Sequence, residues 1–245
     1  DTIFDSNYAG KHGGGMDWYR TVNSTMDNCT FINNIAGKDG GGFYCGDTSA
    51  FEVSTNLTII NTKFLNNTAN YAGGGASIQM RDSHLINCTF ENNIAYFGGS
   101  IVIKDTKTTN NKIINCTFIN STASTVLINS TVQAIIDNFN NVEEFCKGKG
   151  GAIFTRDNLV SVIGCTFINC TGKEGGAVFW DGGDNYQRDN PSRHTGAMAA
   201  DGIIRDSTFI GNNATLGGAI CWTSPNGVVT DSTFIGNNAT LGGAV

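Results

Sequence analysis

The chain has 245 residues, of which 15% are charged, and its formal net charge is −6. The negative charge argues against a nucleic acid or an anionic membrane as partner. No run of 18 apolar residues that could cross a membrane as a helix is present, and no signal peptide is visible. The 32 glycines and two prolines favour a chain rich in turns.

One block, DSTFIGNNATLGGA, occurs twice without change, at Asp206–Ala219 and at Asp231–Ala244. Relaxed copies, each a phenylalanine followed by a glycine pair, cover most of the chain. The phenylalanines are Phe4, Phe31, Phe64, Phe90, Phe118, Phe167, Phe209 and Phe234. The pairs stand at 14–15, 41–42, 74–75, 98–99, 150–151, 175–176, 217–218 and 242–243. Such a period predicts a solenoid in which each repeat stacks on the next.

The residues around these motifs alternate with a period of two, which is typical of a strand with one buried face. After each glycine pair, we expect the first and third residues to point inward and the one between them outward. The expected inward pairs are Met16/Trp18, Phe43/Cys45, Ala76/Ile78, Ser100/Val102, Ala152/Phe154, Ala177/Phe179 and Ala219/Cys221. Short strands joined by turns predict an all-β chain, a single-stranded parallel β-helix of about eight coils. The general handedness of parallel crossovers predicts that it is right-handed.

In chain order, residues 1–27 form the first predicted coil, 28–60 the second with a loop near 46–54, and 61–86 and 87–114 two compact coils. Two insertions follow, at about 122–149 and 181–202, before two regular coils. Residues 1–245 are therefore expected to form one continuous domain. The chain starts and ends inside a coil without a polar cap, so we expect a section of a longer protein.

Asparagine pairs mark the predicted turns, because asparagine tolerates the left-handed backbone and its side chain can bond to stacked copies of itself. N-x-S/T sequons at Asn28, Asn87 and Asn115 are expected to face outward and to accept glycans in a glycosylating compartment. Further candidates are Asn23, Asn56 and Asn129.

The eight cysteines fall into two groups. Cys29, Cys88, Cys116 and Cys165 occupy one inward slot, as small buried side chains in a stack. A disulfide between neighbouring coils is possible there on distance alone. Cys146 and Cys170 break the pattern and are the predicted disulfide pair. No metal site or cofactor is expected, since no C-x-x-C is present and no histidine is close to a cysteine in sequence.

Two groups of residues are candidates for function. The polar loop after the sixth glycine pair carries Asp181, Asp184 and Arg188, which would form the site of an enzyme acting on acidic polysaccharide. A solvated loop is the favoured interpretation. Tyr44, Trp180 and Trp222 are expected at outward or strand-end positions, with the two tryptophans stacked. Such an aromatic strip would bind a glycan or a protein, or would cover the side of the rod.

The paired motifs resemble known surface proteins. The first motif reads FINN at Phe31, FLNN at Phe64, FENN at Phe90 and FIGN at Phe209 and Phe234. The second reads GGAI or GGAV at Gly150, Gly175, Gly217 and Gly242. These resemble the repeats of chlamydial polymorphic membrane proteins and of adhesin-like proteins of methanogenic archaea. Departures are FINS at Phe118, FINC at Phe167, GGSI at Gly98, GGGF at Gly40 and GGGA at Gly73. The resemblance implies a secreted β-helical stalk at the cell surface, and no catalytic residues.

We therefore expect an extracellular adhesin-like or structural rod that presents loops to a glycan or protein on another cell or matrix. One alternative is a polysaccharide lyase or hydrolase built on a β-helix. Another is a self-assembling surface filament or sheath subunit that associates through its open coil ends. Neither nucleic acid nor membrane insertion of this segment is expected.

Overall fold

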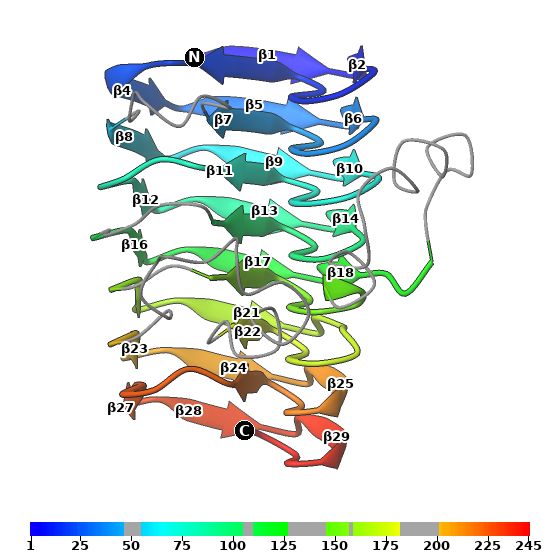
Figure 1. Ribbon diagram of the computed structural model, residues 1–245, viewed down its shortest axis with the longest axis vertical. Helices are drawn as coiled ribbons and strands as arrows, with labels where there is room; N and C mark the ends of the chain where they lie inside the picture. The colour runs from blue at the N-terminus through cyan, green and yellow to red at the C-terminus, as the bar shows by residue number, and fades with distance from the viewer. Residues whose placement is uncertain (47–54, 105–109, 127–145, 157–158, 182–200) are drawn as a thin grey trace, which may run out of the picture.

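The computed structural model describes residues 1–46, 55–104, 110–126, 146–156, 159–181 and 201–245. Across these residues the chain winds repeatedly into short strands that pair in parallel with the winding before and after (Figure 1). The two ends of the chain lie at opposite ends of the stack (Figure 1). The predicted all-β parallel β-helix is confirmed. Most of both predicted insertions, and the loop near 46–54, lie outside the described residues.

Sheet A contains the phenylalanine motifs and has eight strands among the described residues. These are β1 (Thr2–Asp5), β5 (Cys29–Ile32), β9 (Lys63–Leu65), β13 (Thr89–Glu91), β17 (Thr117–Ile119), β21 (Thr166–Ile168), β24 (Thr208–Ile210) and β28 (Thr233–Ile235). Each phenylalanine pairs with the next in register. Their rings stack 4.5–5.0 Å apart between planes tilted by at most 8°.

Three further sides of the winding are also formed by stacked strands. Side B consists of β2 (Tyr8–Ala9), β6 (Ile35–Ala36), β10 (Thr68–Ala69), β14 (Ile94–Ala95) and β18 (Thr122–Ala123), with β25 (Asn213–Leu216) and β29 (Asn238–Leu241) as a separate pair. Sheet C consists of β3 (Met16–Tyr19), β7 (Phe43–Gly46), β11 (Ala76–Ile78), β15 (Ile101–Ile103), β19 (Ile153–Thr155), β22 (Val178–Trp180) and β26 (Ile220–Trp222). Sheet D consists of β4 (Val22–Asp27), β8 (Thr55–Ile60), β12 (His84–Ile86), β16 (Lys112–Ile114), β20 (Ser161–Ile163), β23 (Ile203–Arg205) and β27 (Val228–Thr230).

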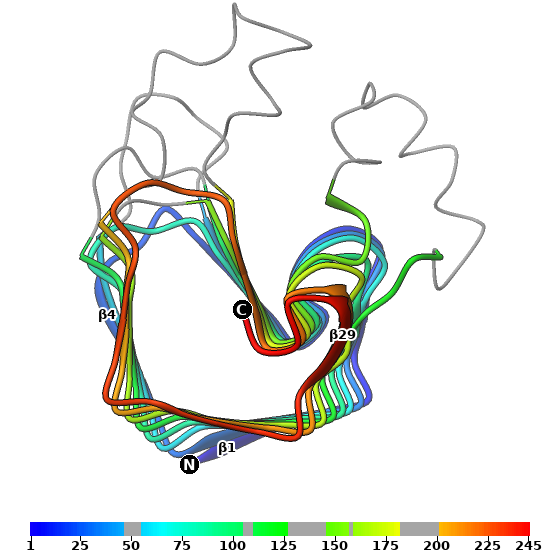
Figure 2. The same ribbon diagram turned by 90° about the horizontal axis from the view of Figure 1, so that it is seen from below.

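Seen along the stack, the windings follow nearly the same outline, and the chain turns back on itself between side B and sheet C (Figure 2). Sheets A, C and D enclose the main core, which includes the phenylalanine column and the inward aliphatic side chains of sheets C and D. The outer face of sheet C therefore faces part of its own chain as well as solvent.

The asparagine ladder that the sequence predicts is present. The first asparagine of a pair, such as Asn66, has a positive φ and an exposed side chain. The second, such as Asn67, is fully buried. The carboxamide of Asn67 accepts hydrogen bonds from the backbone and side-chain nitrogens of Asn34, and donates to the side-chain oxygen of Asn93. Buried amides thus hold neighbouring coils in register, because each has partners above and below.

The glycine pairs form a corner column in which the backbones of successive coils nearly touch. A Cβ added to Gly74 would lie 2.4 Å from the carbonyl oxygen of Gly99, so no other residue fits there. The structurally equivalent glycine with positive φ is Gly73 in the third coil and Gly98 in the fourth. The equivalent pairs in the first three coils are therefore 13–14, 40–41 and 73–74. Each lies one residue earlier than the sequence predicted.

This offset corrects the third residue of each predicted inward pair from the fourth coil on. In the first three coils Phe43, Cys45 and Ile78 face the main core as predicted. From the fourth coil on, the first residues confirmed in the core are Ala152, Ala177 and Ala219. The residues expected to be exposed, Ile101, Ile153, Val178 and Ile220, also lie in the core. The third residues, Val102, Phe154, Phe179 and Cys221, lie on the opposite face of sheet C. The prediction was wrong there because a one-residue slip moves every strand side chain to the other face.

Candidate functional site

The predicted tryptophan strip exists as a stack but not as an exposed surface. Trp180 and Trp222 pair in register, and their rings stack 4.3 Å apart. Trp180, however, is fully buried in the main core, and Trp222 is partly buried against it. Each indole lies against a glycine, Gly202 and Gly227 respectively, where an added Cβ would lie within 2.3 Å of the ring. Trp180 is therefore a packing residue, and its predicted outward position is wrong.

Tyr44 does lie on the outer face of sheet C, but only 2% of its surface is exposed. Its ring stacks on His12 at a centroid distance of 4.5 Å, and its hydroxyl donates a hydrogen bond to Oε1 of Gln79 at 3.1 Å. It does not join the two tryptophans, which face the other side of the sheet. The prediction of an exposed Tyr44 is wrong because other parts of the chain cover this face.

Asp181 is the only member of the predicted enzyme site among the described residues, since Asp184 and Arg188 fall outside them. Its carboxylate is buried. The oxygen Oδ2 accepts hydrogen bonds from Nε and Nη2 of Arg156 at 2.8 and 2.7 Å. A buried carboxylate held in this way has a structural role in pairing with a partly buried cation, so the prediction of a solvated Asp181 is wrong.

A second hydrophobic cluster, which we call the outer cluster, covers the face of sheet C that points away from the main core. It consists of Tyr71, Ala72, Tyr96, Phe97, Val102, Cys146, Phe154 and Phe179, with Cys221 packed against them. Phe97 is the central ring, because it meets both Tyr71 at 4.7 Å and Phe154 at 4.9 Å edge to face. Tyr71, Tyr96 and Phe97 come from the segment just before the glycine pair. Their aromatic character at equivalent positions was the available signal.

Cations line this outer cluster. The Nζ of Lys149 lies 4.5 Å from the ring centroid of Phe179 and 3.1 Å from a carboxylate oxygen of Glu174. The guanidinium of Arg156 lies 5.5 Å from the ring of Phe154, and the Nζ of Lys104 lies 5.4 Å from that of Tyr71. Ammonium and guanidinium groups over ring faces are stabilised by the ring quadrupole. No sequence pattern predicted that these side chains would lie together on one surface.

At the N-terminal end of this face, Asp39 forms a further buried charged site. Its Oδ2 lies 3.3 Å from Nδ1 of His12 and 4.0 Å from Nζ of Lys38. Burial alone would raise the pKa of the Asp39 carboxyl. The neighbouring Lys104, His12 and Lys38 together lower that pKa by more, so the net pKa is below its usual value. Burial raises the pKa of the nearby Asp17, and His12 lowers it in part.

The predicted glycosylation asparagines lie at exposed turns. Asn23, Asn28, Asn56, Asn87 and Asn115 all have a positive φ and exposed side chains. The outward position predicted for Asn28, Asn87 and Asn115 is confirmed, whereas glycan attachment stays a prediction. Asn129 lies outside the described residues.

The predicted disulfide between Cys146 and Cys170 is wrong. All eight cysteines, each within the described part of the chain, are free thiols. Cys170 lies in the main core and Cys146 in the outer cluster, so the two belong to different packed regions. The inward slot predicted for Cys88, Cys116 and Cys165 is confirmed, with about 1% of each exposed.

Neither metal-binding nor membrane-spanning features stand out in the described ranges. No group of three or more histidine, cysteine or acidic side chains there is arranged to hold a metal ion. Over those same residues no helix has the length and hydrophobicity needed to cross a membrane.

The second coil of the stack matches a known repeat family. Residues 28–46 match the model of the Chlamydia polymorphic membrane protein (Chlamydia_PMP) repeat. The resemblance is therefore confirmed for this coil, which runs from the turn at Asn28 through β5, β6 and β7. Curated proteins and solved structures gave no significant match. The matched coil pairs in register with its neighbours on either side, so the chain carries a repeat of this type within a parallel β-helix.

Proposed function

We propose that this chain is a section of an extracellular, cell-surface rod with an adhesin-like or structural role. The observation that carries this proposal is the match of residues 28–46 to a repeat of membrane-associated surface proteins. That repeat is an integral coil of the stack rather than a separate element. A continuous core of stacked phenylalanines supports the mechanical part of the proposal, because each coil is packed against both neighbours.

The described geometry also supports a non-enzymatic role. Two carboxylates among the described residues are engaged in ion pairs with cations, Asp181 with Arg156 and Glu174 with Lys149. Of the aromatic side chains predicted to bind a sugar, Tyr44 and Trp180 are buried and Trp222 is partly buried. In this proposal the rod places its loops at fixed heights, and a glycan or protein on another cell or matrix binds there.

A polysaccharide and glycan array tests the proposal. The intact chain is read once for retention and once for newly released reducing or unsaturated ends. Retention without products is the expected result. Released products would contradict it and favour the polysaccharide-active alternative, while polymers at micromolar concentration without retention would favour the filament or sheath alternative.

A pair of loop replacements locates the contact. In one variant a short Gly/Ser linker replaces residues 182–200, and in the other it replaces residues 127–145. If the polar loop that follows Asp181 binds the ligand, the first variant loses retention at least tenfold and the second keeps it. Circular dichroism on both variants checks that the β-helix is intact. Equal retention by all three proteins would contradict the assignment of binding to that loop.

A further inference from the structure

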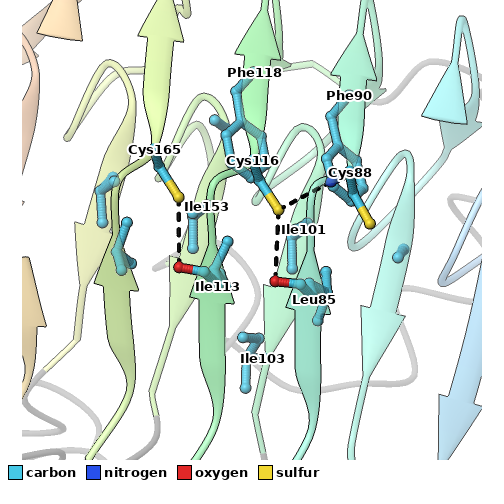
Figure 3. Packing of buried hydrophobic residues seen from close by; sticks show 14 of the residues in the cluster. Leu85, Cys88, Phe90, Ile101, Ile103, Ile113, Cys116, Phe118, Ile153 and Cys165 are labelled. Atoms are coloured by element: carbon cyan, nitrogen blue, oxygen red, sulfur yellow. Dashed lines mark hydrogen bonds between the residues drawn. The ribbon is translucent and has the colours of Figure 1, made fainter. Parts of the chain in front are cut away.

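Three cysteines of consecutive coils occupy one interior column. Cys88, Cys116 and Cys165 stand immediately before strands β13, β17 and β21, which pair in register. Figure 3 shows their side chains pointing into the core at equivalent positions. The column is bounded by hydroxyl residues, since Thr62 lies before Cys88 and Ser207 accepts a hydrogen bond from the backbone nitrogen of Cys165 at 3.1 Å. No side chain of another type therefore separates the three thiols within this column.

The three thiols have the same surroundings. Each sulfur lies near a carbonyl oxygen of the preceding coil: Cys88 near Ile59 at 3.5 Å, Cys116 near Leu85 at 3.6 Å and Cys165 near Ile113 at 3.4 Å. The backbone nitrogen of Cys88 also donates to Sγ of Cys116 at 3.4 Å (Figure 3). The middle sulfur therefore leans towards the coil of Cys88.

Parallel pairing fixes the distances that decide which thiols can join. Neighbouring in-register strands are about 4.8 Å apart, so the Cα atoms of adjacent column cysteines fall within the 4.4–6.8 Å range of disulfides. Cys88 and Cys165 are two coils apart, about 9.6 Å by the same spacing, which is beyond that range. Cys116 can therefore pair with either neighbour, and the outer two cannot pair with each other.

We propose that this column is an oxidation site at which Cys116 forms one disulfide, with Cys88 or with Cys165, and the third thiol stays free. The bond would covalently join two consecutive coils inside the rod. This inference is independent of the proposed adhesin-like role, since it concerns only the core.

The reaction requires a disulfide oxidant and balances as an exchange. A column thiolate attacks a small-molecule disulfide such as oxidised glutathione, which releases one glutathione thiolate and leaves a mixed disulfide. The thiolate of the neighbouring cysteine then attacks that mixed disulfide and releases the second glutathione. The protein loses two electrons and two protons, and the oxidant becomes two thiols.

Burial of the thiols determines when during folding the disulfide can form. Hydrogen bonding with the next thiol along the column, together with burial, raises the pKa of Cys88 and of Cys116. Since only the thiolate reacts, the folded reduced column is inert, and the bond forms while the coils are assembling. Serine is a conservative replacement here because Ser207 and Ser232 occupy the same slot in later coils.

The test is refolding of the full chain from denaturant with reduced and oxidised glutathione, followed by peptide mapping without reduction. In the wild type, Cys116 is expected in a disulfide with Cys88 or Cys165. Cys88→Ser should leave a Cys116–Cys165 bond, and Cys165→Ser a Cys88–Cys116 bond. Cys116→Ser should leave both outer cysteines as free thiols. Circular dichroism confirms that each variant has folded.

A second measurement separates a disulfide from mere packing. The Tm of the oxidised wild type should be several degrees lower when thermal unfolding is carried out with dithiothreitol than without it. The Tm of Cys116→Ser should be the same in both conditions. Three free column thiols in the refolded wild type would overturn the proposal, as would a bond between Cys88 and Cys165. An equal effect of dithiothreitol on both proteins would also overturn it.

Discussion

Individual buried polar side chains hold the coils in register. Asn67 has its carboxamide bonded to the coils on both sides, and the carbonyl of Phe31 accepts its side-chain amide at 2.9 Å. Removing such a group leaves backbone atoms buried without partners. The cost is about 1–3 kcal/mol for each orphaned group.

Asn67→Ala is therefore expected to lower the free energy of unfolding by roughly 3 kcal/mol, because the backbone nitrogen of Asn34 and the carbonyl of Phe31 lose their partners. The matched control is Asn66→Gly, at an exposed residue with φ of 54°, where glycine adopts the backbone without strain. Urea denaturation checks both variants. An Asn66→Gly effect as large as that of Asn67→Ala would contradict the ladder as the source of stability.

Asp39 is expected to make stability depend on acid pH. Its pKa is lowered in the folded chain, so its contribution is present above the unfolded pKa, near 4, and is lost as pH falls through the folded pKa. Asp39→Asn should cost about 3 kcal/mol at pH 7, since it removes the buried anion that faces His12, Lys38 and Lys104. The difference from wild type should shrink below pH 4. Chemical denaturation at pH 7, 5 and 3 measures it, and a difference that does not change with pH would contradict the role of the charge.

At the scale of a strand, alternation decides which substitutions are tolerated. In β21 the side chain of Phe167 is fully buried between two stacked rings, while that of its neighbour Ile168 points outward. Phe167→Ala should therefore lower the free energy of unfolding by about 3–5 kcal/mol. Ile168→Ala should cost about 1 kcal/mol or less. Comparable losses in thermal denaturation would mean that the register of sheet A is not as described.

The same alternation shows where prediction from sequence succeeded and where it failed. In sheet A every coil after the first repeats phenylalanine with a turn asparagine or glycine two residues later, so both the fold and the inward face could be predicted. In sheet C the runs Gly13–Gly15, Gly40–Gly42 and Gly73–Gly75 fit two alignments that differ by one residue. Only the positive φ of the first glycine chooses between them, and sequence does not carry backbone angles.

The candidate site was harder to predict because its burial is not local. Tyr44 lies on the outer side of its strand as expected, but it is buried in contact with His12 and Gln79 of the neighbouring coils. Trp180 faces the interior rather than the surface, because its strand is offset by one residue from the predicted alignment. Exposure at sheet C thus depends on how the chain turns back beside it (Figure 2), which no single repeat specifies.

At the scale of the whole molecule, each coil is stabilised mainly by its two neighbours. A core defect in the middle of the stack should therefore act locally. Phe118→Ala removes the ring between Phe90 and Phe167 and should speed amide hydrogen exchange in β13, β17 and β21 by at least tenfold. Exchange in β1 and β28, at the two ends, should change little. Uniform acceleration along the chain would indicate one cooperative unit instead.

The glycine corner column has a consequence for how such a protein can vary through evolution. Since every coil presents nearly the same backbone to the next, a coil copied whole already fits the one it was copied from. The identical segments Asp206–Ala219 and Asp231–Ala244 would let recombination add or delete a unit of 25 residues. Each such event would change the height of the rod by one strand spacing, about 4.8 Å, and the added coil would carry the same core residues as the original. Length is thus a trait that can be inherited in discrete steps.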